Sequence, residues 1–376
     1  MKIAALLTLL LVSLFASTVE RGVEAYKKGD YRKAFLLYEK AAREGSARAQ
    51  VNLAMMYKYN IGVKKEPKKA LALLEEASRS GYPRALVELG IFYDEGIGIE
   101  PDPSKAFALY EKAASRGYAR AMTRLAQLFE TGRGVRKDPK RAFAWYKKAA
   151  RKGDREAQTN LGAMYDRGIG TRADPVLARF WWEKAAAKGS ADAQNALAYL
   201  YLQGRGVRKD AEKAFSLFLQ AAQKGSARAG HNIAFLYEKG IGVKKSCSEA
   251  VKWYKKAARQ NYTPSMVSLA QLYLDGSCTA KDAKKAAELL EKAAKRGDPA
   301  APFALAKLYE EGEGVRQNFK EAAFWYTIAA QKGDPQAQYN LGLLYYNGLG
   351  VQKDPVRARF LMQKAKEAGL KVPGTL

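Results

Sequence analysis

Small and aromatic apolar residues recur along the chain with a period of 36 residues. Alanine marks each period at the same place, without insertion or deletion: Ala34, Ala70, Ala106, Ala142, Ala178, Ala214, Ala250, Ala286, Ala322 and Ala358. A fixed period of this length is typical of repeat architectures, in which each unit buries its apolar face against its neighbours. We therefore predict one stack of repeats, although a length of 376 residues would ordinarily suggest two or three globular domains.

Two helices are predicted within each period. The first series of apolar residues has the spacing i, i+3, i+4, i+7 and i+8: Ala142, Trp145, Tyr146, Ala149 and Ala150. The second series has the spacing i, i+4 and i+8: Ala157, Leu161 and Tyr165. Gly153 and Gly168 stand where helices usually end in a left-handed conformation, and Pro175 stands at the first position of the next helix. Each period is therefore a helical hairpin.

Composition narrows the fold class and the partners. Strand-favouring runs of Val, Ile and Thr are missing, which favours an all-α chain. The formal net charge is +27, and such a balance suggests nucleic acid, an anionic membrane surface or an acidic polymer. The basic residues are interleaved with carboxylates and form no lysine block or arginine-rich tail, so we expect no nucleic-acid partner.

The N-terminus has the pattern of a secretory signal peptide over residues 1–18. Lys2 precedes an apolar stretch over residues 3–15, and the small residues Ala16, Ser17 and Thr18 follow it. The apolar stretch is short for a membrane span, although an uncleaved anchor is the alternative. We predict export to the periplasm or the exterior after cleavage of this segment.

Residues 142–170 carry the phrase that identifies the repeat. It contains Trp145-Tyr146, Ala149-Ala150, Asn160-Leu161-Gly162 and Gly168-Ile-Gly170. This phrase resembles the Sel1-like repeat, a relative of the tetratricopeptide repeat. The resemblance implies an α/α superhelical solenoid with nine Sel1-like repeats over residues 46–369. A shorter, tetratricopeptide-like capping hairpin is expected over residues 19–45 and a C-terminal tail over residues 370–376.

The sequence contains few residues of the types that form catalytic or metal sites. The chain has one histidine, His231, which leaves almost nothing for a histidine-based metal cluster or a Ser/His/Asp triad. The Gly-x-Gly pairs occur once per repeat after a helix, so they indicate helix ends and not a phosphate-binding loop. We predict that the protein is not an enzyme and uses no metal or cofactor.

The two cysteines interrupt the repeat at related places. Cys278 replaces the second glycine of Gly-x-Gly, and Cys247 stands where other copies carry the loop proline. Both lie nearly equidistant from the turn at residues 260–263, so an antiparallel helix pair would bring them to the same end. In an exported protein this favours a Cys247–Cys278 disulfide. Two unpaired buried thiols are the alternative.

The resemblance implies that the second helix of each hairpin lines a concave face. We expect two columns, those of Thr159 and Ala163, to face solvent there together with a carboxylate rim. The first column reads Val51, Val87, Thr123, Thr159, Asn195, His231, Val267, Phe303 and Tyr339. The second reads Met55, Ile91, Gln127, Ala163, Tyr199, Phe235, Gln271, Lys307 and Leu343.

Eight residues of this face are the predicted binding residues: Tyr199, His231, Phe235, Phe303, Tyr339, Leu343, Glu238 and Asp275. Exposed aromatics in a groove anchor peptide partners, although any one of them could instead pack against the neighbouring helix. We therefore predict a monomeric scaffold of the bacterial envelope that binds a protein or peptide.

Basic residues after Gly-x-Gly-Val form a second candidate surface, here called the basic ridge: Lys64, Lys65, Arg136, Lys137, Arg208, Lys209, Lys244 and Lys245. These residues lie in loops and do not complement a helix C-terminus. The alternative function is therefore binding of a polysaccharide, the cell wall or an anionic membrane surface through this ridge.

Overall fold

The computed structural model describes residues 18–371, and over this range the chain is helical with no strand. The all-α prediction is confirmed. The predicted signal peptide lies outside the described residues except for Thr18, and the end of the C-terminal tail, residues 372–376, also lies outside them. Within residues 18–371, none of the helices combines the length and apolar character that a membrane span requires.

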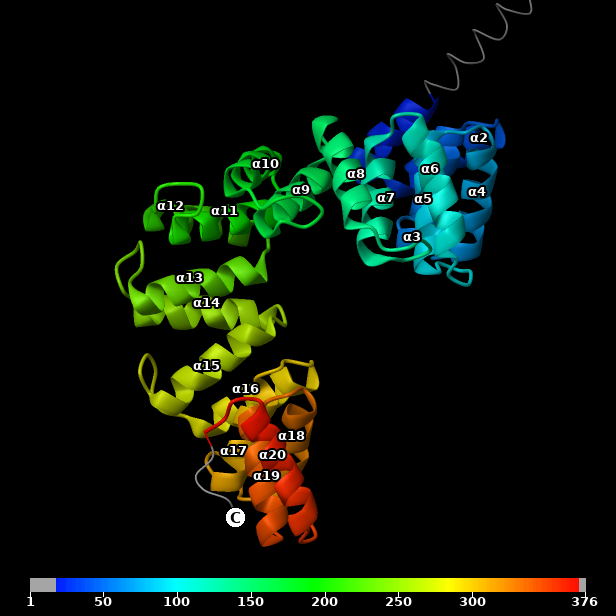
Figure 1. Ribbon diagram of the computed structural model, residues 1–376. Helices are drawn as coiled ribbons and strands as arrows, with labels where there is room; N and C mark the ends of the chain where they lie inside the picture. Colours follow the sequence, from blue (N-terminus) through cyan, green and yellow to red (C-terminus); the bar gives the residue numbers. More distant parts are fainter. Residues whose placement is uncertain (1–17, 372–376) are drawn as a thin grey trace, which may run out of the picture. The chain divides into compact units, whose positions relative to one another are not determined.

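The helices alternate between two positions in the hairpin (Figure 1). The first helices, which carry the marker alanines, are α2 (Tyr31–Arg43), α4 (Pro67–Arg79), α6 (Pro103–Ser115), α8 (Pro139–Arg151), α10 (Pro175–Ala187), α12 (Ala211–Gln223), α14 (Cys247–Arg259), α16 (Ala283–Lys295), α18 (Phe319–Gln331) and α20 (Pro355–Glu367). The second helices are α3 (Ala47–Tyr59), α5 (Pro83–Glu95), α7 (Ala119–Thr131), α9 (Arg155–Arg167), α11 (Ala191–Gln203), α13 (Ala227–Lys239), α15 (Thr263–Asp275), α17 (Ala301–Glu311) and α19 (Pro335–Asn347). Residues 18–27 form a helix that precedes α2.

The sequence sets where each helix begins and ends. At the start of α8, the Asp138 carboxylate accepts a hydrogen bond from the backbone N–H of Arg141, and Pro139 fills the first position, where no amide donor is needed. At the end of α9, Gly168 adopts a left-handed conformation with φ of 69°. This residue can do so without the steric cost that a Cβ atom brings. The same signals recur once per repeat, so the helices have nearly uniform lengths.

A glutamine joins the two helices of a hairpin. The Gln50 side chain donates to the carbonyl of Ala42 at 3.3 Å, and Gln158 donates to the carbonyl of Ala150 at 3.1 Å. These carbonyls lie in the last turn of the first helix, where no intrahelical donor remains. Buried polar groups of this kind need a partner, so the second helix is held in register against the end of the first.

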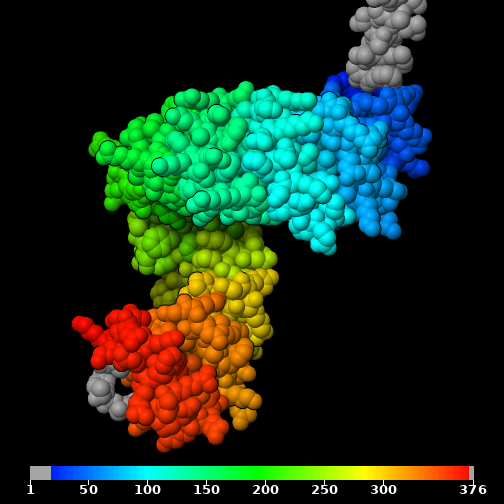
Figure 2. Space-filling model, turned by 45° about the vertical axis from the view of Figure 1, so that its right-hand side comes forward, coloured from blue at the N-terminus to red at the C-terminus, as the bar shows by residue number. Residues whose placement is uncertain are grey.

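Contacts divide the chain into two units, with unit 1 ending at Ala193 and unit 2 beginning at Gln194, inside α11. In Figure 2, unit 1 is coloured from blue through cyan to green, and unit 2 from green through yellow to red. Within unit 1, a core cluster extends from Val19 to Phe92. Within unit 2, a core cluster extends from Ala234 to Leu344. Both are built from the alanines, leucines and tyrosines that the repeat places on the facing sides of its helices.

Candidate binding surfaces on the second helices

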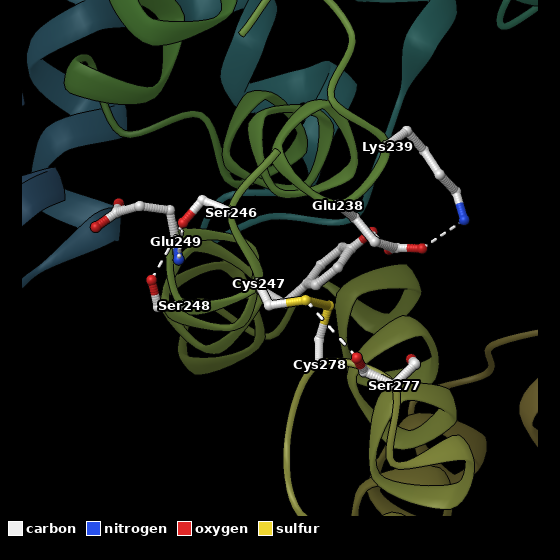
Figure 3. Close-up of a disulfide and its surroundings, with 9 residues drawn as sticks. Glu238, Lys239, Ser246, Cys247, Ser248, Glu249, Ser277 and Cys278 are labelled. Atoms are coloured by element: carbon white, nitrogen blue, oxygen red, sulfur yellow. Dashed lines mark hydrogen bonds and ion pairs between the residues drawn. A yellow bond between two sulfur atoms is a disulfide. The ribbon is translucent and has the colours of Figure 1, made fainter. Parts of the chain in front are cut away.

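Cys247 and Cys278 form a disulfide, as the sequence predicted (Figure 3). Cys247 is the first residue of α14, and Cys278 lies in the loop after α15. Their Cα atoms are 4.8 Å apart across a sequence separation of 31 residues. The bond therefore closes the α14–α15 hairpin at the end opposite its turn.

The disulfide takes the place of a close backbone contact that recurs in other repeats. A Cβ atom built on Gly134 would lie 2.8 Å from the Cβ of Pro103, and one built on Gly98 would lie 2.9 Å from the Cβ of Pro67. Each glycine follows its partner by the same 31 residues that separate Cys247 from Cys278. A glycine is therefore needed in the loop after the second helix, because this loop touches the first residue of the first helix of the same hairpin. In the α14–α15 hairpin, a covalent bond between Cys247 and Cys278 replaces this contact.

Glu238 of the predicted carboxylate rim and two equivalent glutamates, Glu130 and Glu310, are held by tyrosines of the first helices. The Tyr254 hydroxyl donates to the Glu238 carboxylate at 3.0 Å, and the Tyr146 hydroxyl donates to Glu130 at 2.7 Å. Tyr326 and Glu310 make the same bond at 2.5 Å. In each pair the tyrosine lies sixteen residues after the glutamate, on the first helix of the next repeat. Burial, and next the charge of the nearby glutamate, raise the pKa of Tyr146 and Tyr254.

Two copies of the repeat lack both residues of this pair: Phe218 is matched by Leu202, and Leu290 is matched by Leu274. Other copies do not follow this rule, because Trp182 is matched by Asp166 and Leu74 by Lys58. Glu238 also pairs with Lys239 at 2.6 Å. Asp275, by contrast, is exposed and accepts a hydrogen bond only from Gln271 of its own helix, at 2.7 Å, within the described contacts. Glu238 is thus held within the repeat, whereas Asp275 is available at the surface.

Tyr199 is an exposed aromatic residue in a fixed position. Its side chain on α11 is 40% exposed, and its hydroxyl donates to the side-chain amide oxygen of Asn232 at 2.9 Å. Asn232 in turn donates to Asn195 at 3.0 Å, and the Tyr199 ring meets the edge of Phe218 at 5.4 Å between centroids. The network removes rotamer freedom that a partner would otherwise have to restrict on binding.

Phe235 and His231 lie on α13 and differ in their surroundings. Phe235 is 43% exposed, and its one described ring contact is the Lys239 ammonium at 5.9 Å. His231 is half-buried: its Nδ1 lies 3.1 Å from the Ser265 hydroxyl, and its ring packs against Tyr254 and Tyr262. Burial lowers the pKa of His231, although the charge of Glu238 acts in the opposite direction. His231 therefore belongs to the packing between repeats more than to the open surface.

Phe303, Tyr339 and Leu343 are half-buried on α17 and α19. The Phe303 ring lies 5.8 Å from that of Tyr326 and packs against the core cluster of unit 2. The columns of Thr159 and Ala163 were both predicted to face solvent. This prediction is wrong in unit 1, where four members of the two columns are buried: Val51, Val87, Ile91 and Thr123. In unit 1, α3 contacts α5 and α5 contacts α7, so successive second helices cover one another's flanks.

The residues of the basic ridge are exposed in each unit. All eight of its side chains are exposed, and none of them takes part in an ion pair described for residues 18–371. In unit 1, Arg136 and Lys137 line a hollow of about 710 Å³ together with Phe107 and Phe129. The ridge thus offers positive charge that the fold does not itself neutralise.

A groove in unit 1, here called the N-terminal groove, was not predicted from the sequence. It has a volume of about 610 Å³ and lies across the helix of residues 18–27, α3, α5 and α7. Its charged lining residues are Lys27, Arg48, Arg84, Arg120 and Glu88. Its apolar lining includes Tyr26, Met55, Met56, Tyr59 and Ile61.

Three arginines of this groove share one column of the repeat, 36 residues apart, and are here called the arginine column: Arg48, Arg84 and Arg120. Arg48 donates to Glu20 at 2.6 Å, Arg84 to the Asn52 amide oxygen at 2.9 Å and Arg120 to Glu88 at 2.6 Å. Only 3% of Glu88 is exposed. Burial lowers the pKa of the Arg120 guanidinium, but the charge of Glu88 and its hydrogen bond raise this pKa by more. The column could have been found by searching the repeat for one residue type in successive copies.

Over the part of the chain that the structure describes, no group of three or more His, Cys, Asp or Glu side chains is arranged to hold an ion. The surfaces found are a disulfide-closed hairpin, an aromatic pair, a basic ridge and the N-terminal groove.

Comparison with known proteins identifies the repeat. The family described as Sel1 repeat matches ten segments in succession: residues 19–46, 47–82, 83–118, 119–154, 155–190, 191–226, 227–262, 263–298, 299–334 and 335–370. A protective antigen present in uropathogenic Escherichia coli strains, whose crystal structure displays an SLR fold, is 32% identical over 95% of this chain and 77% of its own, with a TM-score of 0.66. A Sel1 repeat protein from Oxalobacter formigenes is 31% identical over 80% of this chain and 88% of its own, with a TM-score of 0.62. No curated protein sequence matches the chain.

Proposed function

Because this chain belongs to the Sel1 repeat family, we propose that it is a non-enzymatic scaffold that binds a peptide or protein partner on the face formed by its second helices. Sel1 repeat proteins generally act as protein–protein interaction scaffolds. In a solenoid the repeat fixes the frame, and the side chains that differ from copy to copy select the partner.

One observation carries the proposal: Tyr199 and Phe235 are aromatic, exposed and one repeat apart in the same column of unit 2. Large aromatic side chains dominate binding energy in protein interfaces because they bury much area at a small entropic cost. Tyr199 is in addition held by Asn232, so it is preorganised for contact.

Photo-cross-linking tests this surface directly. A photoreactive phenylalanine analogue at position 235, on α13, should form adducts with a defined partner in living cells. The same analogue at the exposed position Lys255, on the first helix α14, serves as the matched control. A Tyr199→Ala variant should reduce the adducts at position 235. Equal adducts at both positions, or none at position 235, would contradict the proposal.

We propose that the protein works in the bacterial cell envelope or outside the cell. The charged, apolar and small-residue order of residues 1–18 supports this location. The Cys247–Cys278 disulfide supports it as well, because structural disulfides persist in oxidising compartments. Alkylation of free thiols in whole-cell extracts tests the idea. Both cysteines should resist labelling until a reductant is added, and labelling without reductant would argue for a reducing compartment.

A second candidate function is binding of an anionic polymer or membrane surface through the basic ridge. Eight exposed cations without ion-pair partners in the described chain support it. Binding to anionic vesicles or to an acidic polysaccharide should weaken steeply with salt, because exposed charges are screened within about 8 Å at physiological ionic strength. Reversal of Lys64, Lys65, Lys244 and Lys245 to glutamate should abolish this binding and leave the cross-links from position 235 intact.

A further inference from the structure

We propose that the N-terminal groove of unit 1 binds a short acidic peptide segment in which an aspartate or glutamate lies close to a large apolar residue. The inference rests on the proposed function only in treating the chain as an interaction module. It assigns a different surface, because the aromatic pair lies in unit 2 and the groove lies in unit 1.

Charge within the groove selects an anionic segment. Four cations line it, Lys27, Arg48, Arg84 and Arg120, against one acid, Glu88. Glu20 neutralises Arg48, and Glu88 neutralises Arg120. Arg84 has only the neutral amide of Asn52 as its partner, and neither Arg84 nor Lys27 has a carboxylate within ion-pair distance in the described chain. The groove therefore keeps a net positive charge at its centre.

Arg84 has the geometry that a carboxylate needs. Its guanidinium carries five N–H donors in a planar fork, and the Asn52 oxygen occupies one of them. The remaining donors can take a carboxylate in a bidentate pair, which is stronger and more specific than a single contact. Because Arg84 is half-buried between Arg48 and Arg120 in the column, such a pair would be partly shielded from water.

The floor of the groove selects an apolar neighbour for that carboxylate. Met55 is half-buried, while Tyr59 and Tyr26 are 59% and 37% exposed. Methionine adapts its shape to different apolar ligands, and tyrosine offers a large surface with a polar rim. A bare phosphate would leave these apolar side chains uncovered, whereas a peptide with both acidic and apolar residues would cover them.

A binding assay with three labelled peptides tests this assignment on the full chain. The probe is an acetylated peptide that alternates leucine and aspartate. One control replaces each aspartate with asparagine, and the other replaces each leucine with serine. The probe should bind and lose affinity as salt is raised, and both controls should bind at least about tenfold more weakly. Equal binding of the asparagine control would overturn the proposal.

The matched variants are Arg84→Gln in unit 1 and Arg228→Gln, which lies in the same column in unit 2. Arg84→Gln removes a charge that has no carboxylate partner, so no buried acid loses its counter-charge. A thermal melt checks that the variant is folded. It should weaken the probe about tenfold, since a bond to a charged group is lost. Arg228→Gln should leave affinity unchanged. An unchanged affinity in Arg84→Gln, or an equal loss in Arg228→Gln, would refute the site.

Two further outcomes separate this inference from its competitors. Phosphatidylglycerol vesicles serve as a second probe, and vesicle binding that is lost in Arg84→Gln while peptide binding persists would assign the groove to lipid and overturn the peptide proposal. If the peptide fails to bind while cross-links from position 235 remain, the groove assignment fails and the proposed function stands. If position 235 also yields no adduct, both fail.

Discussion

Unit 1 presents charged residues at one position of the repeat where unit 2 presents mostly neutral residues. In unit 1 this position is occupied by Arg48, Arg84, Arg120, Glu156 and Asp192, and in unit 2 by Arg228, Pro264, Ala300 and Gln336. Glu88, the buried acid of unit 1, corresponds in the repeat to Asn232 of unit 2. Unit 1 therefore ties neighbouring second helices with an ion pair, and unit 2 ties them with amide and hydroxyl hydrogen bonds that also hold Tyr199.

The difference shows which columns the fold requires and which it leaves free. Marker alanines such as Ala106 and Ala250 are fully buried in both units and cannot change without creating overlap or voids. The polar positions of the second helices lie outside this alanine core, so they can be charged in one unit and mostly neutral in the other. This variation is the basis of the two binding surfaces that we propose, one in each unit.

The largest expected effect concerns the covalent bond that unit 2 has and unit 1 lacks. The Cys247→Ser/Cys278→Ser variant should lower the free energy of unfolding of the α14–α15 region by about 3–4 kcal/mol, the chain-entropy value for a loop of this length. Hydrogen exchange resolved by mass spectrometry should show faster exchange there. The equivalent hairpin of unit 1, α6–α7, should exchange as before, since solenoid repeats are stabilised by their neighbours.

A variant with the residues found in other repeats separates the effect of the covalent bond from that of the close packing at the same place. Cys247→Pro/Cys278→Gly restores the residues that unit 1 uses at Pro103 and Gly134. Its stability should fall between that of the disulfide form and that of the double-serine variant, because it regains the close packing without the covalent bond. If the double-serine variant matched the wild type under oxidising conditions, the disulfide would carry no stability.

The next effect tests the ion pair that distinguishes unit 1. Arg120→Gln should cost about 2–3 kcal/mol, because it leaves the buried Glu88 carboxylate without its counter-charge. The value lies at the low end for a buried pair, since the Arg120 side chain is 40% exposed. Chemical denaturation measures it. The double variant Arg120→Gln/Glu88→Gln should recover most of the loss, and failure of that rescue would mean that Arg120 acts through packing alone.

A feature could be predicted from the sequence when it depends on one repeat, and it was missed when it depends on the packing between neighbouring repeats. The 36-residue period, the two helices per period and the helix ends follow from local spacing and from Gly and Pro conformations. The disulfide was also predictable, because Cys247 and Cys278 depart from the repeat at positions that the hairpin brings together. Each of these features depends on one repeat and its own turn.

Features that depend on how neighbouring repeats pack were missed. Val51 and Val87 were expected to face solvent, but they are buried because successive second helices touch. Glu238 was expected at the binding surface, but Tyr254 of the next first helix holds it. The signal for that bond is the recurrence of a glutamate sixteen residues before a tyrosine in three copies, which becomes visible only when positions sixteen residues apart are compared.

Loss of the hydrogen bond between a first-helix tyrosine and a second-helix glutamate should have a smaller effect on stability, and the effect should be the same in both units. Tyr254→Phe removes the hydrogen bond to Glu238, and Tyr146→Phe removes the equivalent bond to Glu130. Each should cost about 1 kcal/mol, because the carboxylate loses one of its donors. Double-mutant cycles with Glu238→Leu and Glu130→Leu measure the coupling. A coupling near zero in either unit would show that the recurring pair is not a stabilising contact there.

The smallest effect is a pH dependence confined to unit 2. His231 is surrounded by Tyr254, Tyr262 and Ser265, with Glu238 as its nearest described charge. Burial holds its pKa below the usual value of 6.5 despite the charge of Glu238, so the unfolded chain binds the proton more readily than the folded chain. The stability from the neutral ring is therefore complete above about pH 6.5 and declines as the pH falls toward the folded-state pKa.

Since the chain has one histidine, its imidazole gives a single assignable NMR signal whose titration reports this pKa directly. The slope of the free energy of unfolding against pH should stay below about 1.4 kcal/mol per unit, the limit for one proton. His231→Gln should remove this component from urea-unfolding curves measured between pH 7 and pH 5, whereas Arg120→Gln should leave it in place. A titration midpoint at or above 6.5 would mean that Glu238 outweighs burial, and the sign of the dependence would then reverse.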